Sequence, residues 1–286
     1  MISLRAVVLS SAVVACSAHA TLVEPRALAS APASASAVPA SPQGIHPSSE
    51  ESFVLFGLRA LAAGDHPRMH DPELGHVEPA LTASYAKMRA DEDDLATLLR
   101  ARKEGDTLVY EPRNAAASTT AIVFLHGYGG AFALPCWQIA HAVASLNVTT
   151  LCPSLDVAAD WGSDHGDSLV RRTVASAKAS GHDHIVLVGL SNGGMGASRL
   201  APKMRGSFSG LVLISGADPT AASPAIPTLV FQGKADGIMS ASSARTYAAV
   251  AHADYVEVAH GHFASLLAQT ELGEALRAFV VTCCRN

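Results

Sequence analysis

His184-Ile-Val-Leu-Val-Gly189-Leu-Ser191-Asn-Gly193-Gly194 is the most informative stretch of the sequence. Its apolar run is typical of a fully buried strand, and the small residues that follow favour a helix over 195–200. Where a strand turns abruptly into a helix, the corner residue is strained and its neighbours need almost no side chain. Gly189 and Gly193 meet that need on either side of Ser191. The pattern predicts a corner that lifts the Ser191 hydroxyl clear of a sheet, at a helix N-terminus that favours negative charge.

The composition predicts a large buried core and argues against several classes of partner. The chain has 286 residues, of which 49% are hydrophobic and 16% charged. An α/β fold often uses about 200–250 residues as one unit. The net charge of −5 comes with no basic block, so we expect no nucleic-acid partner. No apolar run reaches the roughly 20 residues that a membrane-spanning helix needs.

The first 20 residues have the pattern of an export signal. Arg5 precedes an apolar stretch over 6–14 that is too short to span a bilayer. Two cleavage patterns compete: Ala-His-Ala before Thr21, and Val-Val-Ala-Cys16, which resembles a bacterial lipobox with Cys16 as the lipidated residue. Either pattern predicts an exported protein that is periplasmic, extracellular or lipid-anchored to the cell envelope. Lipidation of Cys16 would tether it to the membrane.

Between this signal and the main fold the sequence changes character twice. Residues 21–50 are rich in Ala, Ser and Pro, and too poor in large apolar groups to order, so they indicate a flexible spacer. Apolar residues at helical spacing then predict helices over 53–63 and 79–103. We therefore expect a helical N-terminal extension over 51–106.

From residue 107 onwards, short apolar strands come to alternate with helical stretches. Buried strands separated by helices predict a mostly parallel sheet with right-handed crossovers, and hence an α/β fold over 107–286. The strands are expected at 107–111, 121–126, 148–152, 185–189, 211–215, 228–232 and 255–258. The helices are expected at 134–145, 167–179, 194–202, 240–251 and 264–281.

Ligands bind such sheets at the carboxyl ends of the strands, so the polar residues there are the candidates for chemistry. They include His126, Ser191, Asp218, Asp236, His260 and His262. Four motifs stand in order on these elements: Leu125-His-Gly-Tyr-Gly-Gly130, Gly189-Leu-Ser-Asn-Gly193, Gly233-Lys-Ala-Asp236 and Gly261-His262-Phe263.

Through these motifs residues 107–282 resemble a compact α/β-hydrolase of the esterase/lipase type. The resemblance implies a serine hydrolase that cleaves small carboxylic esters through an acyl-enzyme and needs no cofactor. The short spacings after Ser191 leave no room for a large cap domain. A peptidase or amidase on the same fold, and a non-catalytic binding scaffold, remain alternatives because a fold does not fix the bond that is cleaved.

The resemblance also assigns roles. Ser191 is the expected nucleophile and needs a base. His262 is the expected base because its motif stands in the loop before the last helix, as in the family; His260 is the competitor. Asp236 is expected to orient the histidine. Its alternative is a turn aspartate, with Asp218 as the acid instead.

The oxyanion hole is expected at the backbone N–H groups of Tyr128 and Asn192, with His126 bracing the first of these loops. Apolar side chains near these loops are candidates for a substrate pocket, with ordinary core packing as the alternative. They are Phe132, Trp161, Leu190, Ile238, Met239 and Phe263.

Cysteine and histidine usage adds two expectations. In an exported chain, Cys136 at a helix start and Cys152 at a strand end make a plausible disulfide. The adjacent Cys283 and Cys284 are left open between a vicinal bond, a bond to another chain and the reduced state. The histidines at 66, 70 and 76 have the residue types of a zinc site, but prolines at 67 and 72 indicate a polar loop, so no metal is expected.

Overall fold

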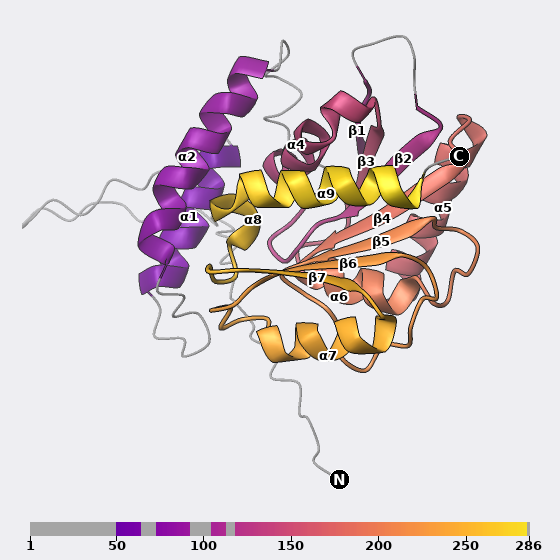
Figure 1. Cartoon of the computed structure of the whole chain (residues 1–286). Coiled ribbons are helices and arrows are strands. Elements are labelled where there is room, and N and C mark those ends of the chain that lie inside the picture. The colour runs from indigo at the N-terminus through magenta and orange to yellow at the C-terminus, as the bar shows by residue number, and fades with distance from the viewer. Residues whose placement is uncertain (1–49, 64–72, 92–103, 113–117, 285–286) are drawn as a thin grey trace, which may run out of the picture. The chain divides into compact units, whose positions relative to one another are not determined.

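A seven-stranded sheet forms the centre of the residues that the structure, a computed structural model, describes: 50–63, 73–91, 104–112 and 118–284 (Figure 1). Its order is β1-β3-β2-β4-β5-β6-β7, with β1 antiparallel to β3 and all other neighbours parallel. The predicted mostly parallel sheet is thus confirmed. The strands are β1 (Thr107–Tyr110), β2 (Thr120–Leu125), β3 (Thr149–Pro153), β4 (His184–Leu190), β5 (Gly210–Ile214), β6 (Thr228–Gly233) and β7 (Asp254–Val258).

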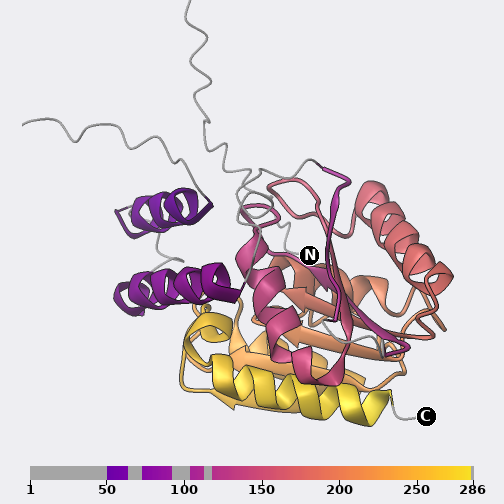
Figure 2. The ribbon, with the colours of Figure 1, turned by 90° about the horizontal axis from the view of Figure 1, so that it is seen from above.

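Helices cover both faces of the sheet (Figures 1 and 2). One face packs on α5 (Asp164–Ala179), α6 (Asn192–Leu200) and α7 (Ala241–Ala251), and the other on α4 (Ala133–Ala142) and α9 (Gln269–Cys283). Alternate strand residues enter the two cores, as the two-residue repeat of a strand requires. In β4, Leu187 lies in the first core and Val186 and Val188 in the second. The central strands are therefore buried on both sides.

Several helix boundaries differ from the prediction for local reasons. α5 begins at Asp164 rather than at residue 167, because the Ser163 hydroxyl caps it by accepting from the Gly166 N–H. α4 ends at Ala142, and a short 3₁₀ turn, η1 (Ala144–Leu146), follows it. The predicted helix over 264–281 is divided at Ala268 into α8 (Ala264–Leu267) and α9.

Two helices, α1 (Glu50–Ala63) and α2 (Leu74–Asp91), precede the sheet and lie beside α4 and α8 (Figures 1 and 2). The second was predicted to begin at Pro79, but it begins at Leu74 and carries Pro79 in its second turn. Burial stabilises this arrangement. Apolar side chains of α2 pack with Leu134 and Trp137 of α4 and Leu266 of α8; they are Val77, Leu81, Tyr85 and Met88.

The export signal, residues 21–49 of the Ala/Ser/Pro-rich spacer and the expected helical residues 92–103 lie outside the described residues. Glu50, predicted as the last spacer residue, is instead the first residue of α1. Within the described ranges, every helix is too short or too polar to cross a bilayer.

Candidate active site

Ser191 occupies a sharp corner between β4 and α6, with φ 54° and ψ −117°. Such a left-handed conformation strains a residue other than glycine by roughly 1–3 kcal/mol, and the surroundings must enforce it. The Ser191 N–H donates to the Ile214 carbonyl at 2.9 Å. A Cβ on Gly193 would lie 2.0 Å from the Leu125 carbonyl oxygen, and one on Gly189 would lie 2.3 Å from the Gly193 carbonyl oxygen. Only glycine lets β2, β4 and α6 approach closely enough to hold this corner.

Two hydrogen bonds connect Ser191 with a histidine and an aspartate. His262 Nδ1 lies 3.0 Å from Asp236 Oδ2, and His262 Nε2 lies 3.0 Å from Ser191 Oγ. A carboxylate only accepts, so Nδ1 carries the proton and the Nε2 of a neutral imidazole accepts from the serine hydroxyl. This arrangement can take a proton from Ser191 and stabilise the imidazolium that results.

The Asp236 side chain is fully buried, and the surrounding turn supplies its hydrogen bonds. Its Oδ1 accepts from the Ile238 and Met239 N–H groups at 2.9 and 2.7 Å. Its Oδ2 accepts from Gln232 Nε2 at 2.9 Å as well as from His262. These four bonds fix the orientation of the carboxylate. The backbones of Ile238 and Met239, two expected pocket residues, thus hold the acid.

Sequence reasoning missed Gln232. Its amide is fully buried in β6 and also donates to the Met239 carbonyl oxygen at 3.0 Å. The signal was present in the sequence, because a buried amide near the carboxyl end of an otherwise apolar strand needs a nearby partner.

The loop after β2 lies directly against the serine. A Cβ on Gly127 would come within 3.1 Å of the Ser191 Cβ. Asn192 is the first residue of α6, so its N–H has no acceptor within the helix. Across the described ranges, neither this N–H nor that of Tyr128 donates to another group. Both N–H groups thus have no acceptor among the described residues, and Tyr128 as a whole residue is 62% exposed.

Hydrogen bonds of the His126 ring hold this loop in place. Its Nε2 accepts from the Leu155 N–H at 3.1 Å, and its Nδ1 lies 2.8 Å from the Gly127 carbonyl oxygen. Accepting at Nε2 and donating at Nδ1 requires the neutral imidazole. The Trp161 indole N–H donates to the His126 carbonyl oxygen at 2.9 Å, so the backbone of His126 is fixed too.

The two alternative residues are engaged elsewhere. Asp218 accepts from the Arg199 guanidinium and from Thr220. Burial raises the pKa of Asp218, but the hydrogen bonds from Arg199 and Thr220 outweigh it and leave the pKa below its ordinary value. His260 Nδ1 lies 2.9 Å from a carboxylate oxygen of Glu73. It is therefore Asp236 and His262 that the structure brings to Ser191.

Trp161 was expected to line a substrate pocket, and this expectation is wrong. Its side chain is 1% exposed and belongs to the core between the sheet, α5 and α6. A Cβ on Gly196 would lie 2.2 Å from the Trp161 Cβ, which shows how closely α6 packs on it. The alternative of ordinary core packing holds for this residue.

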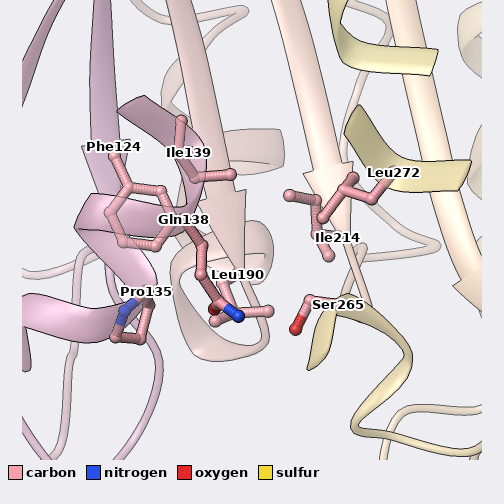
Figure 3. A pocket seen from close by; sticks show the side chains of 8 residues that line it. All are labelled: Phe124, Pro135, Gln138, Ile139, Leu190, Ile214, Ser265 and Leu272. Carbon is pink, nitrogen blue, oxygen red and sulfur yellow. The ribbon is translucent and has the colours of Figure 1, made fainter. Parts of the chain in front are cut away.

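Leu190 borders a small cavity between the sheet, α4, α8 and α9 (Figure 3). Its volume of about 10 Å³ corresponds to roughly one water molecule, too little for an ester substrate. The lining residues are Phe124, Pro135, Gln138, Ile139, Leu190, Ile214, Ser265 and Leu272.

The remaining expected pocket residues, Phe132 and Phe263, are partly exposed. The Phe263 ring meets the His262 ring edge-on with centroids 5.8 Å apart. The Phe132 ring lies 6.0 Å from that of Phe53 on α1. Both rings thus border the loops that hold the site.

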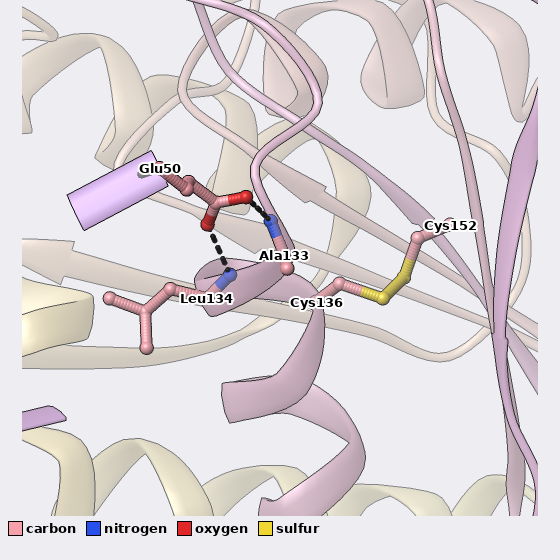
Figure 4. Close-up of a disulfide and its surroundings, with 5 residues drawn as sticks. All are labelled: Glu50, Ala133, Leu134, Cys136 and Cys152. Carbon is pink, nitrogen blue, oxygen red and sulfur yellow. Dashed lines mark hydrogen bonds between the residues drawn. A yellow bond between two sulfur atoms is a disulfide. The ribbon is translucent and has the colours of Figure 1, made fainter. Parts of the chain in front are cut away.

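A disulfide joins Cys136 of α4 to Cys152 of β3, with Cα atoms 6.2 Å apart (Figure 4). Cys283 and Cys284 are not disulfide-bonded, and their sulfur atoms lie 3.2 Å apart.

His76 lies in α2 and not in the polar loop expected for it, while residues 66 and 70 fall outside the described ranges. No group of three or more His, Cys, Asp or Glu side chains in the described residues is arranged to hold a metal ion.

Compared by sequence, the chain matches no protein-family model and no curated protein. Compared by structure, it resembles MGS-MChE2, an α/β-hydrolase enzyme from the metagenome of lagoon sediments at Mar Chica, Morocco. The two are 17% identical with a TM-score of 0.52, over 64% of this chain and 98% of that one. The chain has the α/β-hydrolase fold.

Two further α/β-hydrolase structures match over similar lengths. Est1E from Butyrivibrio proteoclasticus is 14% identical, with a TM-score of 0.53 over 62% of this chain and 93% of that one. XC6422 from Xanthomonas campestris, described as an α/β serine hydrolase without a lid, is 20% identical. Its TM-score is 0.51, over 62% of this chain and 88% of that one. Each is aligned over most of its own length.

Proposed function

We propose that this α/β-hydrolase protein is a serine hydrolase that cleaves carboxylic esters through an acyl-enzyme on Ser191. The observation that carries the proposal is the chain of two 3.0 Å contacts from Asp236 through His262 to Ser191, at a strained strand–helix corner. The structural neighbours support it. XC6422 is described as a serine hydrolase, and Est1E was also solved with ferulic acid, a carboxylic acid of the kind that ester hydrolysis releases.

The first half of the reaction forms the acyl-enzyme. His262 Nε2 takes the Ser191 proton as Oγ attacks the ester carbonyl carbon. The carbonyl oxygen becomes an oxyanion, which accepts hydrogen bonds from the Tyr128 and Asn192 N–H groups. The tetrahedral intermediate then expels the alcohol, which leaves with the proton that His262 returns.

The second half releases the acid. Water attacks the acyl carbon while His262 takes its proton, and collapse of the second intermediate frees the carboxylic acid and returns the proton to Ser191. Throughout, Asp236 keeps the Nδ1 proton in place and stabilises the imidazolium. Its own bonds to Gln232, Ile238 and Met239 keep it oriented for this task.

The test is a fluorophosphonate probe together with a substrate panel. The wild-type chain should be labelled, and Ser191→Ala should not. Ser176→Ala, an exposed serine on α5, is the matched control and should label normally. Labelling that persists in Ser191→Ala would refute the nucleophile. A panel of p-nitrophenyl esters and aminoacyl anilides separates an esterase from a peptidase, and no turnover of either would favour a binding scaffold.

We also propose that the chain works outside the reducing cytoplasm. Disulfides persist in oxidising compartments, and the Cys136–Cys152 bond supports the export that the N-terminal pattern predicts.

A further inference from the structure

The carboxylate of Glu73, directly before α2, forms hydrogen bonds with the loop that carries His262. Glu73, next to the first residue of α2, places Oε1 2.9 Å from His260 Nδ1. Its Oε2 accepts from the Gly261 N–H at 2.7 Å. Bonds to a charged carboxylate are about twice as strong as neutral ones. The Glu73 side chain is only 18% exposed, so water competes little for them.

The Gly261 N–H belongs to the residue directly before His262, so this bond fixes the backbone from which the imidazole extends. A second bond also holds the loop, in which the His260 carbonyl oxygen accepts from the Ala235 N–H at 2.9 Å. Ala235 stands next to Asp236. Hydrogen bonds thus connect the residues directly before His262 both to Glu73 and to the turn that carries the acid.

A second carboxylate, on α1, contacts the start of α4, directly after the oxyanion loop. Glu50 of α1 accepts from the Ala133 N–H at 2.8 Å and from the Leu134 N–H at 3.1 Å (Figure 4). The N-cap residue of α4, Phe132, makes no side-chain capping bond of its own. Glu50 thus supplies the missing cap, and its charge suits the positive end of the helix.

α4 begins at the end of the loop that presents the Tyr128 N–H, so a fixed helix start fixes the end of that loop. The Tyr85 hydroxyl of α2 donates to Glu50 at 2.9 Å and holds the carboxylate in place. The His262 loop is therefore bonded to the residue directly before α2, and the helix that ends the oxyanion loop is bonded to α1.

We propose that α1 and α2 form a positioning element for the catalytic groups, in which Glu73 sets the His262 loop and Glu50 sets the oxyanion loop. The inference rests on the function proposed above. Neither carboxylate touches the reacting atoms, so both are positioning residues. Their loss should impair the chemical step and leave substrate binding largely intact.

Steady-state kinetics test this directly. Glu73→Ala should lower kcat about 10- to 100-fold with KM changed less than about threefold, because a misplaced base of even 1 Å costs up to about 100-fold. Glu73→Gln retains a side-chain oxygen that can accept from the Gly261 N–H, and it should recover most of the activity. Glu50→Ala should act in the same direction through the oxyanion loop.

The matched control is Glu78→Gln. Glu78 lies on α2, but its carboxylate pairs with the exposed Arg59 of α1 and not with either loop. Its kcat should equal that of the wild type. A second readout is the proton NMR signal of the His262 Nδ1–H, which reports the bond to Asp236. That signal should shift or broaden in Glu73→Ala and stay unchanged in Glu78→Gln.

A wild-type kcat in Glu73→Ala, or an equal loss in Glu78→Gln, would overturn the inference while leaving the proposed function standing. If the wild type neither labels nor hydrolyses any ester, the proposed function fails, and the NMR signal still tests whether Glu73 positions His262. If Glu73→Ala does not fold, His260→Ala takes its place. The His260→Ala variant removes one of the two bonds to Glu73 and should give a smaller loss of kcat. An unchanged kcat in His260→Ala together with an inactive Glu73→Gln would refute the proposal.

Discussion

Replacing Gly193 by alanine should disable the site without touching a catalytic side chain. The added Cβ would lie 2.0 Å from the Leu125 carbonyl oxygen and 2.7 Å from that of His126. Both obstacles are backbone atoms, so no side chain can rotate out of the way. Since carbon atoms of this kind keep about 3 Å or more from such oxygens, α6 and the end of β2 must separate by roughly 1 Å.

That displacement has two measurable effects. Overpacking of this kind costs about 1–3 kcal/mol of stability. It also moves Ser191 away from the oxyanion loop, which begins at His126, and a misplacement of about 1 Å costs roughly 100-fold in rate. We therefore expect Gly193→Ala to fold with a lowered melting temperature and to lose about 100-fold in kcat/KM.

The assay pairs fluorophosphonate labelling rates with thermal melts. Gly57→Ala on α1 is the control, because its Cβ would meet nothing within 4 Å. It should keep full activity and gain about 0.5–1 kcal/mol of stability, as alanine favours a helix over glycine. A Gly193→Ala variant with wild-type labelling rate and melting temperature would refute the packing argument.

Four other predictions follow from the contacts described above and from the N-terminal sequence pattern. Asp218→Asn should keep activity within a few-fold, whereas Asp236→Asn should lose about 10⁴-fold in kcat; the reverse result would move the acid to the loop after β5. Burial raises the pKa of Asp218, but hydrogen bonds from Arg199 and Thr220 leave this pKa below its ordinary 3.8. The ionised Asp218 therefore stabilises the folded state above that pH, and this stabilisation is lost as the pH falls through the pKa of the folded state. Melting temperatures of wild type and Asp218→Asn should thus converge in acid. Serine at both Cys136 and Cys152 should lower the free energy of unfolding by about 3 kcal/mol in urea titrations, and an unchanged midpoint would contradict this. Mass spectrometry of the mature protein should find either a diacylglyceryl group on Cys16 or a free Thr21, and an intact Met1 on the active form would argue against export.

Local rules in the sequence predicted the corner at Ser191 and the sheet around it. A Cβ at Gly189 is excluded by the backbone of Gly193, four residues away, whereas a Cβ at Gly193 is excluded by the distant backbone of Leu125 and His126. The glycine pattern around the serine and the continuous apolar runs of the buried strands are nevertheless local features of the sequence. The order of Ser191, Asp236 and His262 along parallel strands then brings them to one edge of the sheet. The corner motif and the strands are patterns of a few consecutive residues, which a sequence displays directly.

The contacts of single polar and aromatic side chains could not be predicted in the same way. Glu73 and Glu50 look like ordinary surface carboxylates in the sequence, and their partners lie 187 and 83 residues away. Trp161 follows a loop near the site, but its burial depends on the close approach of α6 at Gly196. The partners and the burial of such side chains depend on how helices, strands and loops distant in the sequence pack on one another.

The hydrogen bonds between Glu73 and the His260–Gly261 loop also determine when the site is completed during synthesis. Synthesis delivers α1 and α2 first, and the loop that Glu73 holds comes late, after the edge strand β7. Contacts between such distant segments form slowly, because a long stretch of chain must be closed. A growing chain can therefore contain the Ser191 corner and the Asp236 turn and still have no base for its serine. For the function proposed above, we therefore expect the full rate only after Glu73 and the His260–Gly261 loop have met.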